Sequence, residues 1–169
     1  MSEQPNTAPA LEAAYRDRLA ARVPGVAVET YGPAYRDYPL AHPMGALLVV
    51  FVRAEYGEPG DTGDVVQTRT LVFDVVAVAR DAAGGAPHSA ALGMMEEARR
   101  TLAGARVPGF GKTRVRRERF LEHADGQWKY ALTVAAATRA VEEDETTPGP
   151  RLERVTFAQP TDTLEIASG

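Results

Sequence analysis

The chain has 169 residues, of which 44% are hydrophobic and 25% charged, as in a globular domain with a proper core. Its net charge of −4 argues against a protein that coats nucleic acid, and the lack of cysteine excludes disulfides, thiolate metal sites and a cysteine nucleophile. The N-terminal residues show neither a basic start nor an apolar run, and no stretch approaches the roughly 18 apolar residues of a membrane span, so we expect a soluble protein made in the cytoplasm.

Residues 1–8 are polar, and we expect them to be flexible. A helix is predicted over residues 9–22, because apolar side chains recur there at helical spacing: Leu11, Ala14, Tyr15 and Leu19. After a Pro-Gly stop, residues 26–29 alternate as a short strand. Residues 32–43 are rich in Pro and Tyr, which predicts an ordered, irregular loop pinned by its aromatic rings.

The longest predicted unit is an antiparallel hairpin of strands 45–53 and 65–80, joined by a polar loop of Gly, Pro and acidic residues. One face of the second strand is continuously apolar and is assigned to the core: Leu71, Phe73, Val75, Ala77 and Ala79. The opposite face carries Asp74 and Arg80 among valines, and we expect another layer or another subunit to cover it. Since sixteen residues span about 54 Å, the hairpin must bend or project beyond the domain body.

A second helix is predicted over residues 88–103. Its apolar stripe is Leu92, Met95, Arg99 and Leu102, widened by Ala91 and Ala98. A second hairpin, of strands 112–122 and 127–138, turns at Asp125 and Gly126. Its second strand places the bulky side chains on one face: Trp128, Tyr130, Leu132, Val134 and Ala136.

These elements predict an α+β fold, in which a mainly antiparallel sheet of two hairpins plus a short strand carries two helices packed on one face. The predicted domain covers residues 9–141. An acidic, Pro-containing linker at residues 142–150 follows it, and a C-terminal extension at residues 151–169 contains a possible short strand at its start.

No segment predicts a catalytic, cofactor-binding or metal-binding site. Residues 109–113 end in Gly-Lys-Thr, but a phosphate-binding loop needs a Gly where Arg106 stands, a strand before it and a helix after it. The three histidines lie far apart in the sequence, without the pair spacing of metal ligands. The paired carboxylates Glu96 and Glu97 are typical of a solvated helix face.

Residues 112–119 concentrate basic side chains on a predicted strand. Under strict alternation one face receives Lys112, Arg114 and Arg116, and the other receives Arg117 and Arg119. Three roles fit this run: a subunit interface, a solvated edge strand, or nonspecific contact with nucleic-acid phosphates. The first role has acidic complements in the hairpin loop and the linker: Glu55, Glu58, Asp61, Asp64 and residues 142–145.

Six segments in a fixed order resemble a known family. They are Val-Pro-Gly-Val at 23–26, residues 38–49, residues 67–75, Pro-Gly-Phe-Gly-Lys at 108–112, Arg-Glu-Arg-Phe at 117–120 and Gly-Gln-Trp-Lys-Tyr at 126–130. Over residues 11–141 the chain thereby resembles the Mu-like phage and prophage tail proteins that are encoded just before the tail sheath. The residues after Glu142 lie outside the resemblance.

The resemblance implies a tail terminator, which is a compact α+β domain that assembles as a ring, usually hexameric, on the end of a contractile tail tube. Such a ring stops the growth of tube and sheath and presents a surface for the head. The implied partners are further copies of the chain, the tube and sheath proteins and a head-completion protein, at the neck end of the virion tail. The resemblance carries over no catalytic residue.

From the charges, we expect the loop at residues 55–64, or the long hairpin that bears it, to contact the next protomer. The arginines are expected at subunit or tube contacts: Arg114, Arg116, Arg117 and Arg119. The alternatives are another tail-completion adaptor or tube protein, and a nucleotide-binding enzyme that uses residues 109–113. A stand-alone cellular binding module is a further alternative.

Overall fold

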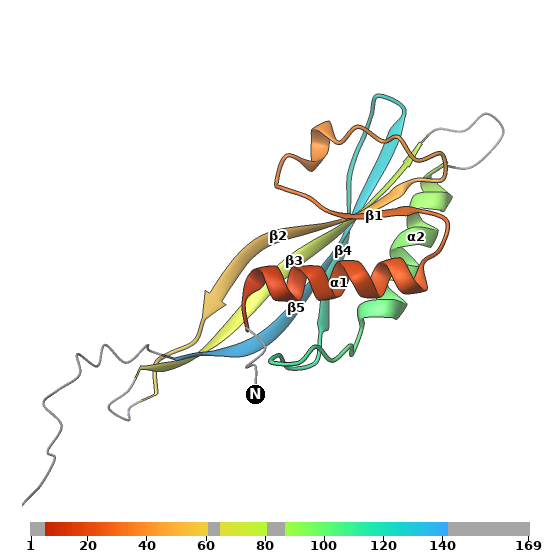
Figure 1. Ribbon diagram of the computed structural model, residues 1–169. Coiled ribbons are helices and arrows are strands. Elements are labelled where there is room, and N and C mark those ends of the chain that lie inside the picture. Colours follow the sequence, from red (N-terminus) through yellow and green to blue (C-terminus); the bar gives the residue numbers. More distant parts are fainter. Residues whose placement is uncertain (1–5, 61–64, 81–86, 142–169) are drawn as a thin grey trace, which may run out of the picture.

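The structure is a computed structural model that describes residues 6–60, 65–80 and 87–141. In these residues a five-stranded sheet, in the order β1-β2-β3-β5-β4, carries two helices on one face (Figure 1). The strands are β1 Ala27–Thr30, β2 Ala46–Tyr56, β3 Val66–Arg80, β4 Arg114–Ala124 and β5 Gln127–Val141, and the helices are α1 Ala8–Arg22 and α2 Pro87–Leu102. The β1–β2 pair is parallel and the other three pairs are antiparallel. The predicted α+β fold is therefore confirmed. The predicted linker and C-terminal extension lie outside the described residues.

Helix α1 forms where the apolar spacing predicts it. The Thr7 hydroxyl accepts a hydrogen bond from the Ala10 N–H, which caps the first turn, and a proline stands in that turn. Leu11, Tyr15 and Leu19 are fully buried against the sheet. The Tyr15 ring packs edge-on against Phe73 of β3, with ring centroids 5.6 Å apart.

Helix α2 buries a stripe that differs from the predicted one. The buried side chains are Ala91, Met94, Met95, Ala98 and Leu102. Leu92 is instead 39% exposed, and Arg99 turns outward to Glu96, with Nε and Oε2 2.8 Å apart. The prediction was wrong for Leu92 and Arg99, because the buried stripe is centred one position earlier, on Ala91, Met94 and Ala98.

Helices cover one face of the sheet, and the segment between β1 and β2 covers part of the other face. The predicted core face of β3 packs under both helices, as expected. On the opposite face, the segment between β1 and β2, which includes a short 3-10 helix at Tyr35–Asp37, lays Tyr38 and Leu40 over Leu48 and Val76. This segment is the additional layer that the apolar second face of β3 predicted, and it covers the half of that face nearest the β4–β5 turn (Figure 1).

At their other end, β2, β3 and β5 continue past the start of α1 (Figure 1). We call this part the distal end: residues 53–60 with β2, residues 65–70 with β3 and residues 137–141 with β5. The long hairpin both bends and projects, since β2 carries a bulge between Phe51 and Arg53 and continues to Tyr56, which pairs with Arg69. Strand β1 pairs only with the first four residues of β2, so the rest of β2 is a free edge among the described strands.

Candidate interaction surface

A bulge in β4 decides where the arginines point. Val115 is paired with Val134, and the next paired residue, Arg117, lies opposite Thr133, so Arg116 is the extra residue. The bulge returns Arg117 and Arg119 to the face of Arg114, away from the helices. The prediction that Arg117 and Arg119 occupy the other face was wrong, because alternation fails where a strand carries an extra residue. We call Arg114, Arg116, Arg117 and Arg119 the arginine cluster.

Arg119 is occupied within the chain. Its Nη2 lies 2.7 Å from Oδ2 of Asp74, which is only 4% exposed. The Thr133 hydroxyl donates to the other carboxylate oxygen at 2.5 Å. The negative charge of Asp74, on the second face of β3, is thus neutralised by Arg119 of the edge strand β4 rather than by another subunit.

The other three arginines of the cluster are exposed, and none forms an ion pair with a carboxylate of residues 6–60, 65–80 or 87–141. They line two adjacent grooves on the sheet. The larger, of ≈ 250 Å³, is lined by Thr68, Thr70, Gly111, Lys112, Arg114, Arg116, Ala135 and Ala137. The smaller, of ≈ 140 Å³, is lined by Arg53, Glu55, Val72, Arg116, Arg117 and Thr133. Val72 and Ala135 form the floor and are buried, which fits arginine stems lying over apolar sheet.

The acidic residues that were predicted to complement the arginines lie in different surroundings. Glu55 lies opposite Thr70 and lines the smaller groove together with Arg116 and Arg117. Its ion pair is with Arg53, whose Nη2 lies 2.6 Å from Oε1. Glu58 is exposed beyond the end of β2. The remaining two, Asp61 and Asp64, lie outside the described residues, so the contact of this loop with another protomer stays a prediction.

The free edge of β2 was missed by the sequence reasoning. Phe51, Val52 and Tyr56 are 40%, 41% and 56% exposed there, and the first two lie in the predicted strand 45–53. Residues 47–52 are apolar at six successive positions, so their pattern does not mark where the neighbouring strand ends. Exposed apolar side chains on an unpaired strand edge are typical of a surface that meets another chain.

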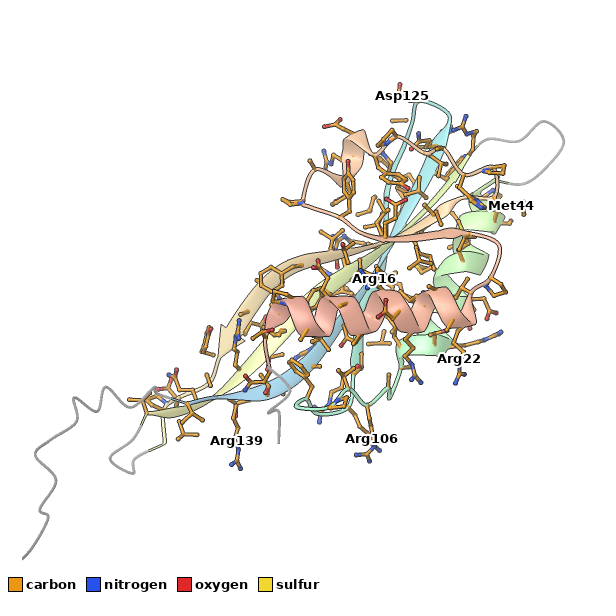
Figure 2. The ribbon with its side chains drawn as sticks, viewed as in Figure 1. Arg16, Arg22, Met44, Arg106, Asp125 and Arg139 are labelled. Atoms are coloured by element: carbon orange, nitrogen blue, oxygen red, sulfur yellow. The ribbon has the colours of Figure 1, made fainter. Side chains whose placement is uncertain are left out.

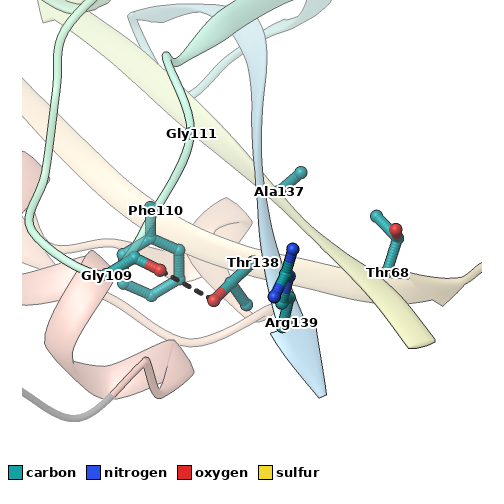
Figure 3. A pocket seen from close by; sticks show the side chains of 7 residues that line it. All are labelled: Thr68, Gly109, Phe110, Gly111, Ala137, Thr138 and Arg139. Carbon is teal, nitrogen blue, oxygen red and sulfur yellow. Dashed lines mark hydrogen bonds between the residues drawn. The ribbon is translucent and has the colours of Figure 1, made fainter. Parts of the chain in front are cut away.

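Residues 109–113 form a helix-to-strand turn, as predicted, and not a phosphate-binding loop. The Gly111 N–H donates to the Ala137 carbonyl at 2.7 Å. The Thr138 hydroxyl donates to the Gly109 carbonyl, also at 2.7 Å (Figure 3). The Thr113 N–H donates a hydrogen bond to the Ala105 carbonyl at 2.9 Å. These groups tie the turn to β5 and to the end of α2, and the depression beside them, of ≈ 490 Å³, is lined by residues of the turn, β3 and β5.

Glu96 of α2 forms ion pairs with Arg99 and Arg100 of the same helix. The hydrogen bond from Arg99 holds the pKa of Glu96 below its ordinary value, which is the wrong direction for a general acid near neutral pH. Across the described ranges, no three His, Asp or Glu side chains are grouped so that they could hold a metal ion. None of the described helices is long and apolar enough to cross a membrane.

The fold and this surface define a small α+β domain with an arginine-lined sheet face. A family model described as Gp37 protein matches residues 16–159, most of the chain, and the chain therefore belongs to this family. No curated protein matches the chain. Among solved structures, it is similar to a chain in the virion of a native gene transfer agent particle, with 21% identity and a TM-score of 0.48, over 79% of this chain and 97% of that chain.

Proposed function

We propose that this protein is a structural component of a phage or phage-like particle and acts there as a tail terminator. Copies form a ring that caps the tail tube and sheath and offers the surface to which the head joins. Membership of the Gp37 family and the six collinear segments that resemble Mu-like tail proteins support this role. The proposed role is structural rather than catalytic, and its place is the neck end of the tail, after synthesis in the host cytoplasm.

The observation that carries the proposal is the distribution of charge and free edge across one sheet. Strand β4 forms one edge and carries the arginine cluster. At the other edge, the part of β2 beyond Val49 has no described strand on its outer side. This part carries Glu55, which is paired with Arg53, and Glu58 follows it. Opposite charges on opposite edges suit a head-to-tail contact between copies, and such contacts produce rings when the rotation closes.

In this arrangement the loop at residues 55–64 contacts the next protomer, and Arg114, Arg116 and Arg117 lie at subunit or tube contacts. Arg119 is the member of the cluster whose charge is already neutralised inside its own chain. In the family that the sequence resembles, the ring is usually hexameric. The partners are further copies, the tube and sheath proteins and a head-completion protein, and the genome passes through the ring without sequence-specific contact.

The solution mass of the purified protein, measured by light scattering with and without its tube protein, tests the proposal. A free ring, or a monomer that closes into a ring on the tube end, is the expected result. A monomer that never associates with tube ends contradicts it. The triple variant Arg114→Ala/Arg116→Ala/Arg117→Ala is expected to dissociate more readily, and unchanged dissociation would count against the assigned contacts.

Electron microscopy of assembled tails separates the terminator from its nearest alternatives. A terminator occurs as one ring at one end of each tail, whereas a tube protein occurs along the whole length. An adaptor is found on the head side and persists on heads that lack tails. Calorimetry with nucleotides addresses the enzyme alternative, for which we expect no heat of binding.

A further inference from the structure

The arginine cluster carries more positive charge than the described part of the chain neutralises. Arg119 is paired with Asp74, and Arg53 with Glu55. Arg114, Arg116 and Arg117 remain without a carboxylate partner among the described residues, and Lys112 lines the same groove as the first two. These cations lie side by side on an exposed sheet face, which is a surface suited to an acidic segment.

The chain contains such a segment directly after β5. The sequence from position 142 reads Glu-Glu-Asp-Glu, four successive carboxylates. Strand β5 ends at Val141, which is 60% exposed at the distal end, where it pairs with Val66. The segment therefore starts at the projecting tip of the sheet, with as many carboxylates as the grooves have unpaired cations.

The register of the sheet shows whose arginines these carboxylates can reach. Arg114 is paired with Ala135 and Arg117 with Thr133, which lie six and eight residues before Val141. Along the strand these separations are about 20 Å and about 27 Å. Glu145 lies at most about 14 Å from Val141, even if the chain is fully extended. A chain that also has to reverse direction at Val141 falls short of its own Arg117 and comes nearest to its own Arg114.

We propose that residues 142–145 of one copy bind the groove formed by Arg114, Arg116 and Arg117 on the next copy. This inference rests on the proposed ring and names the segment that links its successive protomers. It accounts for three exposed arginines on an edge strand and for an acidic run that follows β5 at the tip of the same sheet. Because the charges are exposed, the contact is screened by salt, with a Debye length of about 8 Å at physiological ionic strength.

Cross-linking tests the contact directly, because the natural chain has no cysteine. Arg116→Cys and Glu143→Cys are combined in the full-length chain and treated with a short bis-maleimide, since a direct disulfide needs Cα atoms within about 7 Å. The expected product is a ladder of covalent multimers that ends at the ring number. Mixing the two single-cysteine variants is expected to give dimers.

The matched control places the second cysteine on the helix side, as Arg22→Cys with Glu143→Cys. Arg22 is exposed at the C-terminal end of α1 and points away from the sheet (Figure 2). A ladder of equal strength from this control, or an internally cross-linked monomer as the main product of the test variant, overturns the inference.

A charge-swap experiment separates this inference from the proposed function. We expect at least a tenfold weaker assembly when residues 142–145 are all changed to Lys, or when Arg114, Arg116 and Arg117 are changed to Glu. The chain that carries both sets of changes is expected to recover assembly. Suppose that the wild-type protein forms rings, and that the variant with Lys at residues 142–145 forms rings that dissociate at the same NaCl concentration as the wild-type rings. In that case the inference fails and the proposed function stands. If the wild-type protein forms no ring, alone or on tubes, both fail.

Nucleic acid is the other class of ligand that an arginine surface attracts. A short duplex DNA serves as the probe, in a fluorescence anisotropy titration of the wild-type protein and the Arg-to-Glu variant. Weak binding that assembly abolishes is expected, since the carboxylates of the next copy then occupy the groove. DNA binding that persists unchanged in the assembled ring and requires Arg116 overturns the inference.

Discussion

Asp74 and Arg119 are joined across an intervening strand. Nη2 of Arg119 on β4 lies 2.7 Å from Oδ2 of Asp74 on β3, and between them Thr133 of β5 donates to Oδ1 at 2.5 Å. Three neighbouring strands are thus connected over one sheet face by a carboxylate that is almost completely buried. Because a buried carboxylate is costly without its partners, this contact fixes the edge strand to the centre of the sheet.

We expect Arg119→Ala to lower the free energy of unfolding by about 1–3 kcal/mol, because it leaves Asp74 buried with the Thr133 hydroxyl as its remaining partner. Urea denaturation followed by circular dichroism measures the change. Arg117→Ala is the matched control, two residues away on the same face and without an ion pair in the described chain, and its effect should stay within about 0.5 kcal/mol. Equal losses in the two variants would show that the Asp74 contact contributes nothing specific.

The helix-facing side of β3 and β5 could be predicted from the sequence because these two strands alternate without interruption. Leu71, Phe73 and Val75 lie under the helices as expected, and so does Leu132 of β5. Strict alternation does not predict bulges, and the sheet carries them in β2 and β4. An inserted residue changes which face all later side chains occupy, without any mark in the hydrophobic pattern.

The candidate surface shows the same limit. The run of arginines was visible in the sequence, but the bulge at Arg116 decides that they share one face. The pairing of Arg119 with Asp74 joins residues 45 positions apart, and no local pattern reports such a contact. The free edge of β2 depends on how few residues of β1 pair with it, which is a property of the fold rather than of β2 itself.

Two glycines are expected to respond to alanine in opposite directions. Gly45, just before β2, has a φ of +118°, and an added Cβ would lie 2.6 Å from the Val78 carbonyl oxygen. Gly45→Ala should therefore destabilise the fold by more than about 1 kcal/mol. Gly93 is exposed in α2 with nothing within 4 Å of an added Cβ, so Gly93→Ala should stabilise by about 0.5–1 kcal/mol.

The midpoints of thermal unfolding of the two single variants and of the double variant measure both effects. The sites are on different elements, and the expected shifts are opposite in sign, so the double variant should lie between the two. A stable Gly45→Ala protein would show that β2 can start without the left-handed backbone at this position.

The buried phenol of Tyr15 makes the free energy of unfolding fall at alkaline pH. Burial raises the pKa of Tyr15 to about 12, against the opposing effect of its hydrogen bond with Thr113. Its contribution is fully present below about pH 10, where the phenol of the unfolded chain ionises, and is lost as pH rises towards 12. Over that window the unfolded chain binds fewer protons than the folded one, so the free energy of unfolding falls by up to about 1.4 kcal/mol per pH unit.

Tyr15→Phe should reduce this pH dependence, and urea denaturation at about pH 9 and about pH 11 measures it. The slope should not vanish, because the pKa of Tyr38 is also raised to about 12, first by burial and then by its hydrogen bond to Glu29. At neutral pH the variant should lose about 1 kcal/mol, since the buried Thr113 hydroxyl loses its partner. An unchanged slope would mean that Tyr15 ionises in the folded protein as easily as in the unfolded chain.

The free edge of β2 should matter for assembly and not for folding. Val52 is the bulged residue of this edge and is 41% exposed, so Val52→Lys removes little buried area and adds a charge of the kind that prevents edge pairing. We expect an unfolding midpoint close to that of the wild-type protein and a clear loss of ring mass in light scattering. Leu92→Lys is the control, because Leu92 is similarly exposed, at 39%, but lies on α2 rather than on the edge of β2. Equal loss of assembly in the two variants would indicate a general effect of removing surface apolar area.

Loss confined to Val52→Lys would assign the contact to the edge of β2. This edge lies opposite the arginine cluster, and a head-to-tail ring requires contacts at opposite edges.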